Sequence, residues 1–151
     1  SLQRRPVIIN SGRGEVVDEV ALKAALDSEK VCCAVIDTWE HEPNIDRNLL
    51  ERVFLGTPHI AGYSADGKAN GTRMALEAVA RHFGLDLSFH IQAPALPADY
   101  AYCVEHFSPH HPHAPYLRCY DPRRDSDALK SKPEDFERLR GDYPLRREFF
   151  S

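Results

Sequence analysis

The stretch PVIINSGRGEVVDEVALKAALDSEKVCCAVID, residues 6–37, predicts a strand, a helix and a second strand in succession. Residues 7–10 are an apolar run after a proline, as in a buried parallel strand. Asp18 is a good N-cap for a helix over residues 19–28, and residues 31–36 are a second continuous apolar run. Strand, crossover helix and strand in this order are typical of a doubly wound parallel sheet in an α/β fold.

The segment that follows extends this pattern. Residues 53–55 are a short apolar run that predicts a third strand, and residues 57–62 form a loop that leaves its end. Ser64 is placed to cap a long helix that ends at Gly84. We therefore predict that residues 1–84 are the second half of a Rossmann-like, doubly wound domain with a long return helix.

Composition changes after residue 84, where we place a domain boundary. Prolines and histidines are frequent between residues 92 and 115, and clear periodicity is lost there. Residues 117–121 have the pattern of a strand, and the charged stretch after Pro122 includes a predicted helix over residues 133–140. We predict that residues 85–151 form a small α+β C-terminal domain.

Composition and charge argue against several classes of protein. The sequence is 42% hydrophobic and 28% charged, which is typical of a globular protein with a core. A net charge of −4 without a basic face gives no support for nucleic-acid binding. No segment approaches the roughly 18 apolar residues that span a bilayer. We therefore expect a cytoplasmic protein with no nucleic-acid or membrane partner.

The cysteines and histidines predict neither a disulfide framework nor a metal site. The four cysteines lack the spacing of a disulfide scaffold, so we predict buried thiols in a reducing compartment. One group has the ligand types of zinc but no recognisable ligand spacing, and we predict no metal there. Its members are Cys103, His106, His110, His111, His113 and Cys119.

Three loops that each follow a predicted strand carry chemically useful side chains. In an open α/β sheet, ligands bind outside the carboxyl ends of the strands, so Arg13, residues 37–42 and His59 should meet. A guanidinium, carboxylates and an imidazole suit proton transfer coupled to hydride transfer at a carbon that bears a hydroxyl. The imidazole takes the hydroxyl proton and a carboxylate orients the ring. The guanidinium holds a substrate carboxylate.

The motifs in these loops resemble three signatures of the D-isomer-specific 2-hydroxyacid dehydrogenases. They read NSGRGEVVD at residues 10–18, IDTWEHEP at residues 36–43 and TPHIAGYS at residues 57–64. They occur in the family's order and at about its spacing. The resemblance implies an enzyme that uses NAD and a small-molecule substrate, a 2-hydroxy acid that is oxidised to a 2-oxo acid.

The resemblance also implies roles for single residues. Arg13 resembles the family's substrate-binding arginine, Glu42 the glutamate that pairs with the catalytic histidine, and His59 that histidine. Asp37 resembles the aspartate that contacts the carboxamide of the cofactor. The other implied cofactor-binding positions line the nicotinamide side or let a loop approach it closely: Ser11, Gly12, Arg13, His59, Ala61 and Gly62.

Residues 120–125 and 136–149 resemble a C-terminal extension that most members of the family lack. In the subfamily that has it, the extension is a dimerisation domain, and the enzyme acts on a phosphorylated hydroxy acid in pyridoxal phosphate biosynthesis. The resemblance therefore implies a homodimer held by residues 85–151. We expect its aromatic anchors to be Phe136, Tyr143, Phe149 and Phe150.

Two alternatives stay open. One is a dehydrogenase for another 2-hydroxy acid such as phosphoglycerate, glycerate or lactate. The other is an NAD-sensing module that binds protein partners, as in transcriptional co-repressors of the same superfamily. The family's GxGxxG fingerprint, its ribose-binding acidic residue and its substrate domain are not found in these residues. We therefore expect a C-terminal fragment of a longer enzyme.

Overall fold

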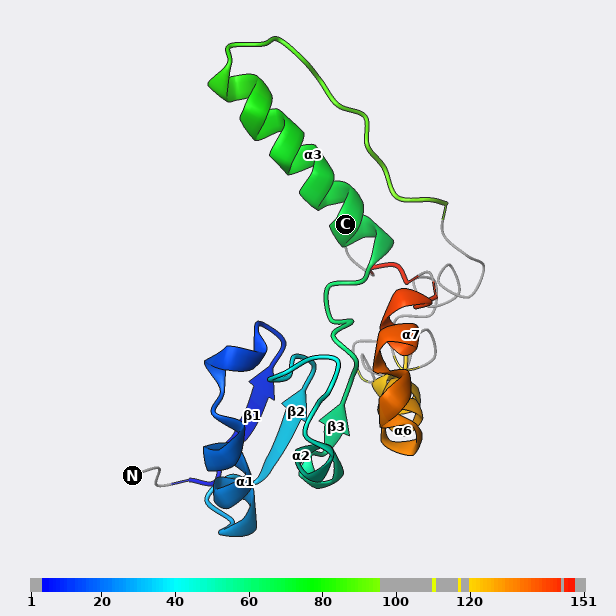
Figure 1. Ribbon diagram of the computed structural model, residues 1–151. Helices are drawn as coiled ribbons and strands as arrows, with labels where there is room; N and C mark the ends of the chain where they lie inside the picture. The colour runs from blue at the N-terminus through cyan, green and yellow to red at the C-terminus, as the bar shows by residue number, and fades with distance from the viewer. Residues whose placement is uncertain (1–3, 96–109, 111–116, 118–119, 145, 149–151) are drawn as a thin grey trace. The chain divides into compact units, whose positions relative to one another are not determined.

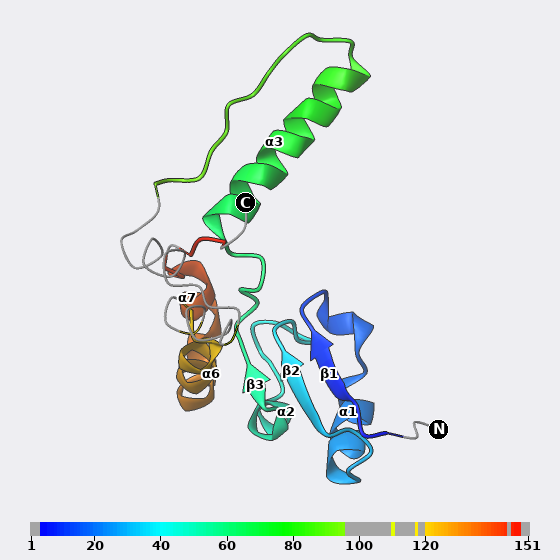
Figure 2. The same ribbon diagram turned by 180° about the vertical axis from the view of Figure 1, so that it is seen from behind.

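The computed structural model describes most of the chain, and Figures 1 and 2 show it from opposite sides. The described residues are 4–95, 110, 117, 120–144 and 146–148. The chain divides into two compact units: unit 1 comprises residues 1–61 and 122–143, and unit 2 comprises residues 62–121 and 144–151.

Unit 1 is built on a parallel sheet of three strands in the order β1-β2-β3. The strands are β1 (Val7–Asn10), β2 (Cys33–Ile36) and the short β3 (Leu55–Gly56). One face of the sheet is buried, because Ala34 and Ile36 are 0% and 2% exposed. The opposite face is open in the described residues, where Val7 and Ile9 are 53% and 70% exposed. The predicted parallel α/β arrangement is confirmed.

One short 3₁₀ segment and two capped helices connect the strands. After β1 come η1 (Gly14–Val16) and α1 (Glu19–Asp27), and α2 (Arg47–Arg52) precedes β3. Asp18 caps α1 as predicted, since its carboxylate accepts the amide hydrogen of Ala21 at 2.9 Å. Asp46 caps α2 in the same way by accepting from the amides of residues 48 and 49. The helices bury leucines from one side against the sheet.

Three helical segments from the C-terminal part of the chain complete unit 1. They are α6 (Pro122–Ser131), η2 (Pro133–Asp135) and α7 (Phe136–Gly141), and both ribbon views place α6 beside β3. Leu129 and Phe136 are 0% and 1% exposed and belong to the same core as the sheet residues. Ser126 Oγ accepts a hydrogen bond from the amide of Gly56 at 3.1 Å. The core therefore extends past β3 into α6 and α7.

Unit 2 contains the long helix α3 (Ala65–His82), which Ser64 caps as predicted. The Ser64 hydroxyl accepts from the amide of Gly67 at 2.9 Å, and Gly84 adopts a φ of +64° just beyond the helix. Arg147 donates to both carboxylate oxygens of Asp66 at 2.8 Å, and this guanidinium holds the pKa of Asp66 below its ordinary value. The pair ties the chain's last described residues to the start of α3.

Several local predictions are wrong. β2 begins at Cys33, because residues 31 and 32 form a bend, and Cys32 is exposed rather than buried. The strand predicted over 117–121 does not form at the described residues: Leu117 is helical, and residues 120 and 121 have no regular structure. Helix α6 was not predicted, while the predicted helix over 133–140 is η2 followed by α7.

Phe136 is also corrected, because it lies in the core of unit 1 and not on a surface where it could anchor a dimer. Phe149 and Phe150 lie outside the described residues. So do the cysteines and histidines for which no metal site was predicted, apart from His110: Cys103, His106, His111, His113 and Cys119. The division at residue 84 and the α+β dimerisation domain over 85–151 stay predictions. Among the described residues, no helix is long and apolar enough to cross a membrane.

Candidate active site

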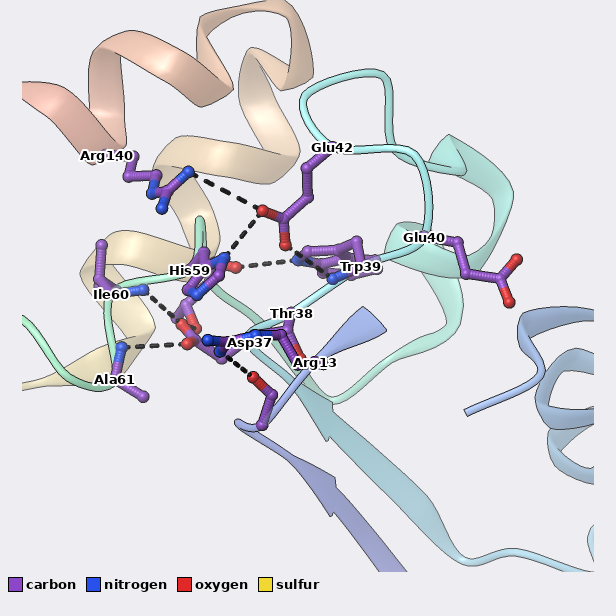
Figure 3. A network of polar contacts seen from close by, with 12 residues as sticks. Arg13, Asp37, Thr38, Trp39, Glu40, Glu42, His59, Ile60, Ala61 and Arg140 are labelled. Atoms are coloured by element: carbon purple, nitrogen blue, oxygen red, sulfur yellow. Dashed lines mark hydrogen bonds and ion pairs between the residues drawn. The ribbon is translucent and has the colours of Figure 1, made fainter. Parts of the chain in front are cut away.

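The carboxyl ends of the three strands of unit 1 carry the predicted chemical groups. Arg13 follows the end of β1, Asp37 directly follows β2, and His59 lies shortly after β3. Glu42 comes from the loop that begins at Asp37 (Figure 3). Parallel strands end at a common edge of their sheet, which is why side chains far apart in sequence come together here.

An imidazole–carboxylate pair forms the centre of this site. His59 Nδ1 donates to Glu42 Oε2 at 2.8 Å, and the two side chains are 25% and 19% exposed. Among the described residues, no hydrogen bond is made by the other ring nitrogen, Nε2. Because a carboxylate only accepts, the proton lies on Nδ1 and Nε2 of the neutral ring is an acceptor. That is the tautomer that a proton-accepting histidine needs.

The backbone around His59 is held in an uncommon conformation. His59 has a φ of +55°, in the left-handed region that residues with a side chain seldom adopt. Its amide donates to the carbonyl oxygen of Asp37 at 2.8 Å and to that of Thr57 at 3.1 Å. These two bonds fix the residue at the end of β3, so the ring is presented from a rigid loop.

Asp37 organises the same loop with its carboxylate. Oδ1 accepts from the Thr57 hydroxyl at 2.6 Å and from the Ile60 amide at 2.8 Å, and Oδ2 accepts from the Ala61 amide at 3.0 Å (Figure 3). The side chain is 5% exposed, so three charge-assisted hydrogen bonds offset the cost of burying it. Asp37 therefore positions the loop that carries His59.

Glu42 is held at both of its oxygens. Oε1 accepts from the amide of Trp39 at 2.9 Å, while Oε2 meets His59 and lies 4.0 Å from Nη1 of Arg140 on α7. Trp39 is 2% exposed, and its indole N–H donates to the carbonyl of Thr57 at 2.9 Å. The loop that carries Glu42 is thus anchored in the core of unit 1.

Asn10 shapes the turn that carries Arg13, a role that the sequence did not indicate. Its side-chain amide donates to the Arg13 carbonyl at 3.0 Å, and its Oδ1 accepts from the Gly12 amide at 3.2 Å. Arg13 itself is exposed and donates from Nη1 to the carbonyl of Gly12 at 2.8 Å. An asparagine that ends an apolar strand just before a glycine turn is the signal that could have identified this role.

The turn after β1 and the loop after β2 are in direct backbone contact. A Cβ added to Gly14 would lie 2.1 Å from the carbonyl oxygen of Trp39, so only glycine fits there. Next to it, Glu19 accepts from the amide of Glu40 at 2.9 Å, and burial raises the pKa of the Glu19 carboxyl above its ordinary value of 4.5. Close packing therefore fixes the Arg13 turn against the segment that leads to Glu42.

The structure brings together, within unit 1, most of the residues that the motifs indicated. Gly62 is the first residue of unit 2, so its relation to this edge stays a prediction. The roles of all these residues toward a cofactor or substrate also stay predictions. The residues that share the edge are Ser11, Gly12, Arg13, Asp37, Glu42, His59 and Ala61.

A family model described as "D-isomer specific 2-hydroxyacid dehydrogenase, NAD binding domain" matches residues 1–61. Residues 1–61 are therefore similar to the NAD-binding domain of this family. They contain the three strands and the whole imidazole–carboxylate pair, so the family match covers the part of unit 1 in which the site is built. The resemblance read from the three motifs is confirmed.

Proteins named erythronate-4-phosphate dehydrogenase are similar to nearly the whole chain. The protein of Bacteroides thetaiotaomicron is 52% identical and that of Bacteroides fragilis 55% identical, over 98% of this chain in both cases. The protein of Marinobacter nauticus is 41% identical over the same share. This chain spans 41% of the length of each of these curated relatives. The similarity includes α6 and α7, which lie beyond the family model's match.

Proposed function

We propose that the full-length protein containing this chain is an NAD-dependent dehydrogenase. It oxidises 4-phospho-D-erythronate to the 2-oxo acid, a step in the biosynthesis of pyridoxal 5′-phosphate. The observation that carries the reaction type is the pair of His59 and Glu42, with Nε2 of the imidazole open at the carboxyl end of a parallel sheet. The name shared by the similar proteins supports the choice of substrate.

The residues at this edge fit the nicotinamide end of NAD. A carboxylate accepts about four hydrogen bonds, and Asp37 uses three of them within unit 1, which leaves one for a carboxamide N–H. The neighbouring Thr38 hydroxyl is buried without a partner in the described part of the chain, as expected where a ligand or another part of the protein supplies one. Ser11 and Gly12 would line the same side of the cofactor.

The side chains divide the chemistry between them. Bound NAD would accept the hydride that leaves C2 of the substrate. His59 Nε2 accepts the proton of the C2 hydroxyl, so that the C2–O bond becomes a carbonyl as the C–H and O–H bonds break. Glu42 stabilises the imidazolium that forms and keeps the ring oriented. Arg13 is exposed and holds the substrate carboxylate in its planar fork.

We further propose a cytoplasmic homodimer. Support for a dimer comes from unit 2, where Leu76, Val79 and Phe83 lie along one side of α3 and its end and are 38%, 53% and 68% exposed. Apolar surface of this kind is typical of an association site. The cytoplasmic assignment rests on the reduced thiols expected from the cysteine spacing.

Replacing the proposed base tests this function. In the full-length protein, His59→Gln should lower kcat for NAD reduction with 4-phospho-D-erythronate by about 10²–10⁴-fold, the range typical of general acid–base catalysis. The dissociation constant for NAD, measured by calorimetric titration, should hardly change. The matched control is His82→Gln, because His82 lies on α3 in unit 2 and has no proposed role in the reaction. A loss below about tenfold, against that expected range, would remove His59 from this role.

A further inference from the structure

A cation from the C-terminal helices lies beside the imidazole–carboxylate pair. Nη1 of Arg140 is 4.0 Å from Glu42 Oε2, the same oxygen that accepts from His59 Nδ1 at 2.8 Å. Arg140 is 35% exposed, so its charge is only partly screened by solvent. Figure 3 shows the guanidinium and the imidazole meeting the carboxylate of Glu42. Glu42 thus faces two cationic groups whenever His59 is protonated.

The position of Arg140 follows from the packing of its helix. Phe136 lies four residues earlier on α7, is 1% exposed and belongs to the core of unit 1. Leu139, next to Arg140, is partly buried against the same core. Residues four apart lie on the same side of a helix, so the buried Phe136 fixes the direction in which Arg140 extends. The contact with Glu42 is therefore set by the fold.

Charged side chains from several elements lie near His59. Arg13 follows β1, Asp37 and Glu42 lie after β2, and Arg140 comes from α7, whereas Glu40 extends away from them (Figure 3). Asp37 is engaged by three donors of the loop after β3, and Glu42 is the carboxylate in contact with the ring. The positive charge of Arg140 beside Glu42 partly offsets the negative charge of this carboxylate. Without Arg140, the full charge of Glu42 would act on the imidazolium.

We propose that Arg140 is a positioning residue that acts on His59 through Glu42. Its guanidinium lies beside Glu42 Oε2, so its positive charge opposes the stabilisation of the imidazolium by Glu42. The C-terminal helices would in this way take part in the site that the strands build. The use of the imidazole as a base rests on the function proposed above, whereas the charge effect of Arg140 does not.

The titration of His59 measures this effect directly. In the full-length protein with histidine labelled at Cε1, NMR gives the titration midpoint of each imidazole, and His59→Gln identifies the signal of residue 59. Arg140→Gln should raise that midpoint by about half a pH unit, about a threefold change in proton affinity, as for a partly exposed ion pair. Arg140→Lys keeps the charge and should restore the wild-type midpoint.

Arg138→Gln is the matched control. Arg138 lies on the same helix, is 59% exposed and pairs with Asp135 at 2.6 Å, away from the site. Its replacement should leave the midpoint of His59 unchanged, whereas an equal shift for both arginine variants would overturn the proposal. An unchanged midpoint in Arg140→Gln would overturn it as well.

Kinetics separates this proposal from the proposed function. If Arg140→Gln moves the midpoint, the pH at which kcat/KM for oxidation is half-maximal should rise by the same amount. Wild-type protein that fails to oxidise 4-phospho-D-erythronate would refute the function, and the NMR midpoints would still decide the role of Arg140. Active wild-type protein with unmoved midpoints would refute only the role of Arg140.

Discussion

Replacing Phe136 by alanine tests whether α6 and α7 form one cooperative unit with the sheet. Phe136 is 1% exposed and packs in the core that contains Ile36, Leu50 and Leu129. Truncation of a fully buried phenylalanine costs about 3–5 kcal/mol through lost burial and a residual cavity. For a domain of this size the midpoint of thermal unfolding should fall on the order of 10 °C. Thermal unfolding of the full-length protein, followed by circular dichroism, measures the shift.

The same variant also tests the placement of the proposed catalytic residues. Because Phe136 directs Arg140 toward Glu42, Phe136→Ala should alter kcat at temperatures well below its own midpoint. Phe54→Ala is the control in the same unit, since Phe54 is 64% exposed and should lose less than about 1 kcal/mol. If Phe136→Ala cost no more than Phe54→Ala, or affected only subunit association, the assignment of α7 to the core of unit 1 would be refuted.

Two further changes address charge and assembly. Glu19→Gln keeps an acceptor for the Glu40 amide and removes a carboxyl whose pKa is raised by burial. The protonated carboxyl contributes its full stability below its unfolded pKa, and this contribution is lost as pH rises through the folded pKa. The free energy of unfolding in urea of Glu19→Gln, relative to that of the wild type, should therefore increase from pH 4 to pH 7. A difference that stays constant with pH would contradict this. Phe83→Glu should lower the mass measured by light scattering if the apolar surface of unit 2 holds a dimer. Asn70→Glu, at an exposed position on another side of α3, should not, and equal masses for the two variants would refute that surface.

The strands and the imidazole–carboxylate pair could be predicted from the sequence because each rests on a local signal. The apolar run before the Arg13 turn predicts β1, and Asp18 and Ser64 cap α1 and α3 as their side chains suggest. The residue types in the short motifs around Glu42 and His59 indicate an imidazole paired with a carboxylate, and the structure contains this pair. These features depend on a few neighbouring residues, and tertiary packing did not override them.

The contribution of α6 and α7 could not be predicted because it depends on contacts between distant parts of the chain. Within α6, Ala128 and Leu129 stand in a run of charged and polar residues, so its apolar periodicity is weak. Arg140 lies in a stretch where positive and negative side chains alternate, a pattern that usually indicates a solvent-exposed surface. Its approach to Glu42 follows from the burial of Phe136, which no local pattern reveals.

The most direct test of the proposed reaction is a crystal structure of the full-length protein with NAD and 4-phospho-D-erythronate bound. In that structure His59 Nε2 should lie about 2.6–3.2 Å from the C2 hydroxyl oxygen, the range for a general base. Glu42 should remain on Nδ1, and Arg13 should pair with the substrate carboxylate. A bound substrate whose C2 hydroxyl faces another proton acceptor, with Nε2 turned away from it, would refute His59 as the base.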